Sequence, residues 1–180
     1  TLSDLTSLGY DWYRAATSTN PAAQVPSLRL LIGDTSGNAI GYLVYEPTYN
    51  GYGAVMPTDQ WETSSIDPTS SILWWSQFGK GPDENYTRTL NDWIAGDHST
   101  GFDTLSGDNR ILGLSTGVGS GWNGTFDMAV DNVMVGFNEQ PSTTFNFEVQ
   151  SVPEPSSFAM LSIAGFSALA VSRIRRRRSA

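Results

Sequence analysis

The side chains that could carry out acid–base or nucleophilic chemistry are few. The chain has one histidine, His98, and no cysteine among its 180 residues. A nucleophilic triad needs a base, normally histidine, and a zinc site needs two or three histidine or cysteine ligands. A retaining glycosidase needs two acids about 5 Å apart, and the best pair, Asp127 and Asp131, stands where the strand alternation slips. We therefore expect no enzyme activity and place His98 in a solvated loop.

Acidic residues cluster in one stretch rich in Gly and Ser, GDHSTGFDTLSGDN at 96–109. Calcium binds several carboxylate and carbonyl oxygens from a flexible loop, so Asp97, Asp103 and Asp108 form a candidate calcium site. The alternative, that these residues are simply turn formers, is favoured because no EF-hand spacing is present. No other cofactor is expected.

Aromatic side chains are the second binding signal, with six Trp and seven Tyr in the chain. Trp74 and Trp75 must point to opposite faces of a strand, so one is displayed or covered by a loop if the other fills the core. The candidate ligand-binding residues are Tyr49, Tyr52, Trp75 and Trp122, all close to Gly, Asp or Asn. The alternative for each of them is that the ring packs between two sheets.

The elements that must position these residues are predicted to be short β-strands. Runs of β-branched and aromatic residues alternate with turns rich in Gly, Asp and Asn. Strands are expected at 27–32, 40–45, 60–66, 72–78, 110–116, 125–130, 132–137 and 144–149. The first two form a hairpin. Seven to nine strands of this kind predict an antiparallel β-sandwich or jelly roll over residues 1–151.

Two segments depart from plain alternation. Tyr86, Leu90 and Trp93 recur at helical spacing and predict one helix over Asp83–Ala95, with Asp83 or Asn85 as its N-cap. In 125–137 the apolar residues change parity between Val130 and Val133, which predicts a bulge or tight turn at Asp131-Asn132.

The C-terminal segment has a charge opposite to that of the rest. Residues 1–152 carry five basic and 17 acidic side chains, near −12, whereas 153–180 hold five Arg and one Glu. Phe158–Val171 is uncharged and, with its flanking serines, reaches the roughly 17 residues that a membrane span requires. By the positive-inside rule the arginines lie in the cytoplasm and the acidic body outside. We expect an extended hinge at 152–157 and a transmembrane sorting helix at 158–180.

The order of these features resembles the PEP-CTERM sorting signal of exported bacterial proteins. Its three parts are a Pro-Glu-Pro motif, the apolar run and an Arg cluster, carried by Val152, Pro153, Glu154, Pro155, Arg173, Arg175, Arg176, Arg177 and Arg178. The resemblance implies that a membrane exosortase recognises the tail and cleaves near the motif. No secretory signal is present in the first thirty residues, so it is either absent or removed before Thr1. We expect removal or truncation, because the tail would serve no purpose without export. The alternative is an ordinary single-span anchor.

The body, too, has a resemblance, carried by LTSLGYDWYR, GYLVYEPTYNG, PTDQW and GSGWNGTFDMAVDNVMVGF. These stretches resemble an exported bacterial domain, and Val130–Gly136 is similar to the xDNVxVG strand of concanavalin- or laminin-G-like sandwiches. This implies a lectin-like β-sandwich.

We expect a non-catalytic protein of the cell surface or extracellular matrix whose partners are the membrane, an exosortase and an exopolysaccharide. The alternatives are a structural adhesin, a plain membrane-anchored surface protein or a glycan-active hydrolase. Nucleic acid is not an expected partner, because the five basic residues of the body are scattered.

Overall fold

The computed structural model describes residues 1–83, 85–96, 102, 105–119 and 121–148. Its helices and strands all lie in one unit, Thr1–Phe147. The hinge and sorting tail expected at 152–180 lie outside the described residues. Within the described part of the chain, no helix is both long and apolar enough to cross a membrane.

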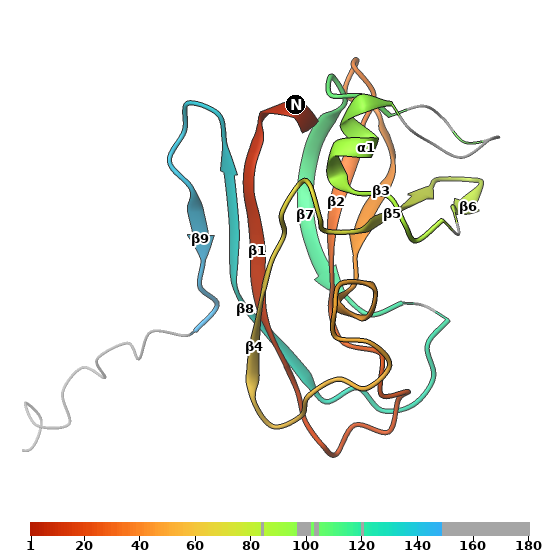
Figure 1. The fold of residues 1–180 in the computed structure, drawn as a ribbon, viewed down its shortest axis with the longest axis vertical. Helices are drawn as coiled ribbons and strands as arrows, with labels where there is room; N and C mark the ends of the chain where they lie inside the picture. Colours follow the sequence, from red (N-terminus) through yellow and green to blue (C-terminus); the bar gives the residue numbers. More distant parts are fainter. Residues whose placement is uncertain (84, 97–101, 103–104, 120, 149–180) are drawn as a thin grey trace, which may run out of the picture. The chain divides into compact units, whose positions relative to one another are not determined.

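Nine strands of the described chain form two antiparallel sheets (Figure 1). The four-stranded sheet has the order β4-β1-β8-β9, with β4 at Trp61–Ser65, β1 at Leu5–Arg14, β8 at Met128–Phe137 and β9 at Thr143–Phe145. The five-stranded sheet has the order β6-β5-β3-β2-β7, with β6 at Gly81–Pro82, β5 at Leu73–Gln77, β3 at Ala39–Tyr45, β2 at Ser27–Gly33 and β7 at Arg110–Gly117. Short 3-10 turns at Leu2–Asp4 and Pro47–Tyr49 and one helix, α1 at Leu90–Ala95, complete the described elements. The prediction of a mainly β chain with antiparallel sheets and one short helix is confirmed.

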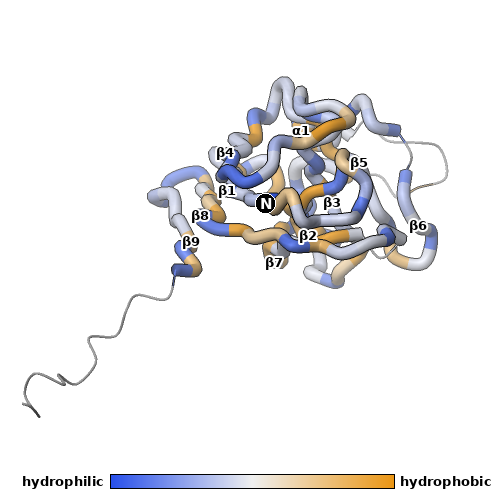
Figure 2. The backbone as a smooth tube through the Cα atoms, turned by 90° about the horizontal axis from the view of Figure 1, so that it is seen from below, coloured by the Kyte–Doolittle hydropathy of each residue, from blue (hydrophilic) through white to orange (hydrophobic). Residues whose placement is uncertain are grey.

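Side chains from both sheets form a single hydrophobic core. The five-stranded sheet contributes Leu28, Leu30, Ile32, Leu43 and Trp75, and the four-stranded sheet contributes Leu8, Tyr10, Trp12 and Val133. The buried polar atoms of two of these rings are satisfied: the Tyr10 hydroxyl donates to the Pro26 carbonyl over 2.6 Å, and Trp12 Nε1 donates to Ser64 Oγ over 3.0 Å. Figure 2 shows hydrophobic residues along β2, β8 and α1 and hydrophilic residues in the turn between β8 and β9. The two sheets thus form a two-layer, sandwich-like arrangement.

The predicted hairpin is formed by β2 and β3. Their register runs from Leu28 opposite Tyr45 to Gly33 opposite Ala39. In the connecting turn, the Asp34 carboxylate accepts hydrogen bonds from both the backbone N–H and the side-chain amide of Asn38, at 2.8 and 2.9 Å. The turn chemistry of Asp, Asn and Gly therefore specifies this connection, as the sequence indicated.

The predicted irregularity at Asp131-Asn132 is a β-bulge within one continuous strand, β8. Opposite Gly9–Asp11 of β1, the register shifts by one residue, and Asn132 has a φ of 48°. The Asn132 side chain donates to Asp11 Oδ2 over 2.8 Å. The extra residue restores the apolar side chains on both sides of the bulge to one face.

The predicted helix is real but much shorter than Asp83–Ala95, and both expected N-caps are wrong. Thr89 is the N-cap: its hydroxyl accepts from Asp92 N, and the Asp92 carboxylate accepts from Thr89 N in return. Asp83 instead accepts a hydrogen bond from Asn85 N and forms an ion pair of 3.0 Å with Arg88. The carboxyl of Asp83 and the amide oxygen of Asn85 accept from the backbone N–H groups of Asn85 and Thr87, which favours turns over a helix at these residues.

Candidate ligand-binding site on the five-stranded sheet

The outer face of the five-stranded sheet carries a row of side chains that the register brings together. Arg29 of β2 lies opposite Ser115 of β7 and Val44 of β3, and Val44 lies opposite Trp74 of β5. Directly opposed residues on one face of a sheet have Cβ atoms about 5 Å apart. Because Leu28, Leu30, Leu43 and Trp75 face the core, this row faces away from it. A cation and an indole ring therefore lie on one surface with an aliphatic side chain between them.

A cavity of about 180 Å³ lies on this face. It is lined by Ser27, Arg29, Tyr42, Val44, Glu46, Trp74, Ser76 and Gly119. Drug-sized sites are typically about 300–1,000 Å³, so this cavity fits a single small unit. Its lining combines an aromatic ring, a guanidinium, a carboxyl and hydroxyl groups. Such a set suits a ligand with both an apolar face and several hydrogen-bonding groups.

Arg29 is held in place by the segment that follows β7. Its Nε donates to Ser27 Oγ over 3.1 Å, and its Nη2 donates to the Val118 carbonyl over 2.8 Å. Ser27 is itself fixed, because its hydroxyl donates to the Gly117 carbonyl over 3.0 Å. The guanidinium is thus pre-oriented, which lowers the entropy lost when it binds a ligand.

Glu46 directly follows β3 and is half-buried beside Arg29 and Trp74. Burial raises the pKa of its carboxyl to about 7, although the Arg29 guanidinium and the Trp74 indole act in the opposite direction. Within the described residues, no hydrogen bond or ion pair joins the Glu46 carboxyl to Arg29. The cavity therefore contains a carboxyl and a guanidinium that act on each other electrostatically but do not touch.

Aromatic rings extend the site on one side. The rings of Tyr49 and Tyr86 are stacked with centroids 4.4 Å apart, and Tyr86 meets Trp74 edge to face at 6.1 Å. Trp74 is partly buried, and its indole N–H is directed at the Glu46 carboxyl without forming a fully aligned hydrogen bond within the described residues. Tyr49, predicted from the sequence as a ligand-binding residue, therefore borders the site through Tyr86.

Trp122 borders the site at Gly119. A Cβ built at Gly119, which lines the cavity, would lie 3.0 Å from the Trp122 ring. Trp122 also stacks on Phe126, with centroids 6.1 Å apart. The Trp122 ring therefore packs against Gly119 at the edge of the cavity.

The other two aromatic candidates lie elsewhere. Trp75 is 0% exposed and packs in the core, so the prediction that it is displayed is wrong; Trp74 is the ring on the outer face. Tyr52 meets Trp12 edge to face at 5.3 Å, and its hydroxyl donates to Glu62 of β4. Tyr52 thus belongs to the side of the four-stranded sheet.

The candidate calcium residues are only partly described. Asp97 and Asp103, like His98, lie outside the described residues, and Asp108 is exposed. Neighbouring Asn109 is occupied, because its side chain accepts from Ser106 N and donates to the Gly33 carbonyl. Among the described residues no group of three His, Asp or Glu is placed to hold a metal ion. The calcium site remains a prediction.

The two acids considered for hydrolysis do not line the cavity. Asp127 accepts a hydrogen bond from the Thr17 hydroxyl over 2.8 Å. Asp131 is buried, and one of its carboxylate oxygens accepts from both Asn132 N and Phe147 N. The Asp127 carboxylate therefore holds the Thr17 side chain next to the start of β8, and the Asp131 carboxylate stabilises the backbone at the bulge within β8.

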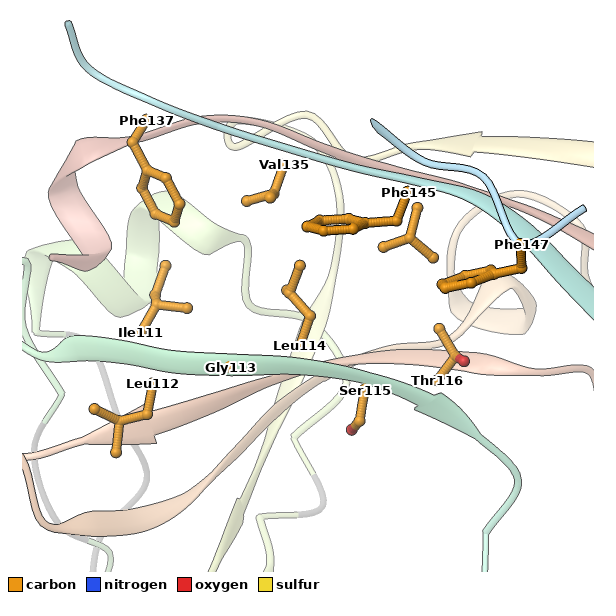
Figure 3. A pocket seen from close by; sticks show the side chains of 11 residues that line it. Ile111, Leu112, Gly113, Leu114, Ser115, Thr116, Val135, Phe137, Phe145 and Phe147 are labelled. Carbon is orange, nitrogen blue, oxygen red and sulfur yellow. The ribbon is translucent and has the colours of Figure 1, made fainter. Parts of the chain in front are cut away.

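A second, larger groove of about 500 Å³ lies between the edge strand β7 and the strands β8 and β9. Figure 3 shows Ile111 and Leu114 of β7 pointing toward Val135, Phe137, Phe145 and Phe147. Phe145 and Phe147 are 46% and 59% exposed. The lining is almost entirely apolar and offers few groups that could orient a polar ligand.

Sequence reasoning missed Arg29, Glu46, Trp74 and Tyr42 as site residues. One signal was available: Arg29 alternates with Leu28 and Leu30, which places a lone cation on the outer face of a strand. No motif marks Glu46.

No family model, curated protein or solved structure matches the chain.

Proposed function

We propose that this chain is an exported, non-catalytic protein of the cell surface or extracellular matrix that binds a neutral glycan on the outer face of its five-stranded sheet. Sugars offer an apolar ring face together with hydroxyl groups. Trp74 supplies a flat ring. In the same cavity Arg29 supplies hydrogen-bond donors and Glu46 supplies hydrogen-bond acceptors. That combination is the observation that carries the proposal.

The charge of the body favours a neutral ligand over an acidic one. Residues 1–152 are near −12, and such a field repels a polyanionic polysaccharide before contact. The cavity supplies one carboxyl from the described residues, whereas retaining hydrolysis of a glycoside uses two about 5 Å apart. The proposal is accordingly for binding.

The sorting tail is the second part of the proposal. Its Pro-Glu-Pro motif at 153–155, apolar run at 158–171 and final arginines follow the order of a PEP-CTERM signal. A transmembrane helix at 158–180 would hold the body outside the cytoplasmic membrane until an exosortase processes it. Export to a matrix rich in polysaccharide is consistent with a glycan site on the body.

The binding site can be tested by replacing its aromatic ring. We expect Trp74→Ala to weaken binding to a neutral polysaccharide by at least tenfold, because the stacking surface is removed. The full chain is used in a polyoxyethylene detergent, since sugar-headed detergents would compete for the site. Retardation in gels containing dextran, galactomannan or xyloglucan measures the binding.

Trp61→Ala is the matched control. Trp61 is 53% exposed on β4 of the other sheet, where its ring lies 5.7 Å from that of Tyr13. This variant should bind like the wild type. Equal binding by wild type and Trp74→Ala would refute the site. Sedimentation as large assemblies without any glycan would instead favour the structural adhesin, which the exposed Phe145 and Phe147 make the second candidate.

A further inference from the structure

We infer that Glu46, acting as a carboxylate, selects the sugar: two adjacent hydroxyl groups of a neutral sugar bridge Glu46 to Arg29. This inference rests on the proposed glycan-binding function and names the groups that the site recognises. Glu46 then serves as a specificity-determining residue, distinct from the ring of Trp74 that supplies the stacking surface.

The gap between Glu46 and Arg29 is the first step of the argument. Both line the same cavity, and no hydrogen bond or ion pair joins the carboxyl to the guanidinium. A guanidinium only donates and a carboxylate only accepts. A sugar hydroxyl does both, so adjacent hydroxyls can accept from Arg29 and donate to Glu46. Water molecules can form the same number of hydrogen bonds with Arg29 and Glu46. A sugar also brings an apolar ring that packs against the neighbouring side chains.

The surroundings of the gap suit a sugar ring. Val44 forms an aliphatic floor between Arg29 and Trp74 in the cross-strand row. Trp74 Nε1 is a buried donor directed at the Glu46 carboxyl, where it helps to lower the pKa, although the two do not form a fully aligned hydrogen bond in the described residues. A hydroxyl or ring oxygen of the bound sugar can accept from it. One ring face would then lie on apolar surface while its edge meets three polar groups.

The same carboxylate excludes acidic sugars. A uronate whose carboxylate reached Arg29 would place a second negative charge inside a cavity of about 180 Å³ that already holds Glu46. Two carboxylates in one partly buried site repel each other strongly. The site therefore selects neutral sugars both by hydrogen bonding to their hydroxyl groups and by charge repulsion of acidic sugars.

Glu46 is the group in this site that titrates near neutrality. Burial raises its pKa to about 7. Arg29 of β2 and the Trp74 indole of β5 act in the opposite direction, and the Glu46 carboxylate in turn helps to raise the pKa of Tyr49, in the turn after β3, and of Tyr10 of β1. Burial raises the pKa of Tyr49 to about 12 and that of Tyr10 well above its usual value, so both stay neutral from pH 6 to 8.

The sign of the pH dependence follows. If only the ionised carboxylate binds, the apparent affinity is the intrinsic affinity multiplied by the ionised fraction. That fraction is small at pH 6, is half at the pKa and is close to one at pH 8. Affinity for a neutral polysaccharide should therefore rise about tenfold from pH 6 to pH 8, since the pKa is about 7.

The experiment compares wild type, Glu46→Gln and the control Glu62→Gln at pH 6 and pH 8. Glutamine keeps the size of the side chain but cannot ionise. Glu62 is a carboxyl on β4 of the other sheet. The probes are galactomannan as the neutral polysaccharide and polygalacturonate as the acidic one. We expect Glu46→Gln to lose the pH dependence, to bind galactomannan about tenfold more weakly than wild type at pH 8, and to bind polygalacturonate more tightly than wild type does. Glu62→Gln should follow the wild type.

The failures are distinguishable. Galactomannan binding that depends on Trp74 but is independent of pH and unchanged in Glu46→Gln overturns the inference and leaves the proposed function standing. Wild type that prefers polygalacturonate at pH 8 overturns the inference in the same way. A wild type that binds neither probe nor any glycan of the panel at either pH refutes the proposed function, and the inference falls with it.

Discussion

Trp74 and Trp75 are adjacent residues with opposite environments. Trp75 is completely buried, and a Cβ at Gly41 would lie 2.6 Å from its ring, so the ring packs directly against the backbone of β3. Trp74 faces the cavity beside Arg29 and Glu46. One ring stabilises the fold and the other is available to a ligand.

The core role of Trp75 leads to a stability prediction. Trp75→Ala should lower the free energy of unfolding by about 3–5 kcal/mol, because it removes a large buried side chain and leaves a cavity. Trp61→Ala should change it by no more than about 0.5 kcal/mol, because Trp61 is mostly exposed. Urea unfolding curves of the two variants test this, and similar losses in both would contradict the assignment of Trp75 to the core.

The sequence could predict that one of these rings is displayed but not which one. In the stretch 72–78, the even positions are Ile72, Trp74, Ser76 and Phe78, whereas the odd positions are Leu73, Trp75 and Gln77. Apolar content favours the first set, yet the second faces the core, with Gln77 only 5% exposed. The pairing of β5 with β3 and β6, which is not visible in a local pattern, decides the face.

At the scale of elements, the bulge in β8 is the feature that the sequence predicted best. Asn132 adopts a left-handed backbone conformation that Asn tolerates and a β-branched residue does not. The parity change from Val130 to Val133 is a local signal, so the sequence contained enough information. The hairpin of β2 and β3 was predictable for the same reason, since its turn residues lie between two regular runs.

The bulge should be sensitive to the residue at 132. Asn132→Val should destabilise the protein by about 1–3 kcal/mol, because it forces a β-branched side chain into positive φ. Asn132→Gly relieves that strain and should cost about 1 kcal/mol, the value of the lost hydrogen bond to Asp11. Thermal or urea unfolding measures both variants, and a Gly variant less stable than the Val variant would rule out backbone conformation as the cause.

Strand β1 and the true start of α1 were not predicted, for reasons that are also physical. β1 carries Gly9, Asp11 and Arg14 within its run, and its alternation is broken by register shifts against β8. Arg14 is nonetheless buried, because its guanidinium donates to the Asn20 carbonyl. Tertiary contacts thus override a weak local pattern. For α1, the ion pair of Asp83 with Arg88 replaces the helix that spacing alone suggested.

At the scale of the whole molecule, the division of charge is the main feature. The body is near −12, and the last 28 residues hold five Arg and one Glu. This asymmetry is the basis for proposing an outward-facing body and a cytoplasmic C-terminus. The charge division was readable from the sequence, but the site on the outer sheet face was not, because it depends on strands distant in sequence.

The sorting proposal predicts a processing event. Expressed with an export signal in a bacterium that has an exosortase, the protein should lose its tail by cleavage near Val152–Ser157, and the body should leave the membrane fraction. In the same strain without the exosortase, the full-length chain should stay in the membrane. Intact mass and fractionation measure both outcomes, and full-length protein in the membrane of both strains would indicate a plain anchor.

The arrangement of the six tryptophans has a consequence for spectroscopy. Trp12, Trp75 and Trp93 are fully buried, whereas Trp61, Trp74 and Trp122 are exposed or partly exposed. Buried indoles emit at shorter wavelengths and are shielded from aqueous quenchers, while the outer ones respond to their surroundings. Intrinsic fluorescence therefore contains two separable signals, one from the buried rings that reports loss of the core and one from the outer rings. In Trp61→Ala the outer signal comes from Trp74 and Trp122 and reports what covers the outer face of the five-stranded sheet.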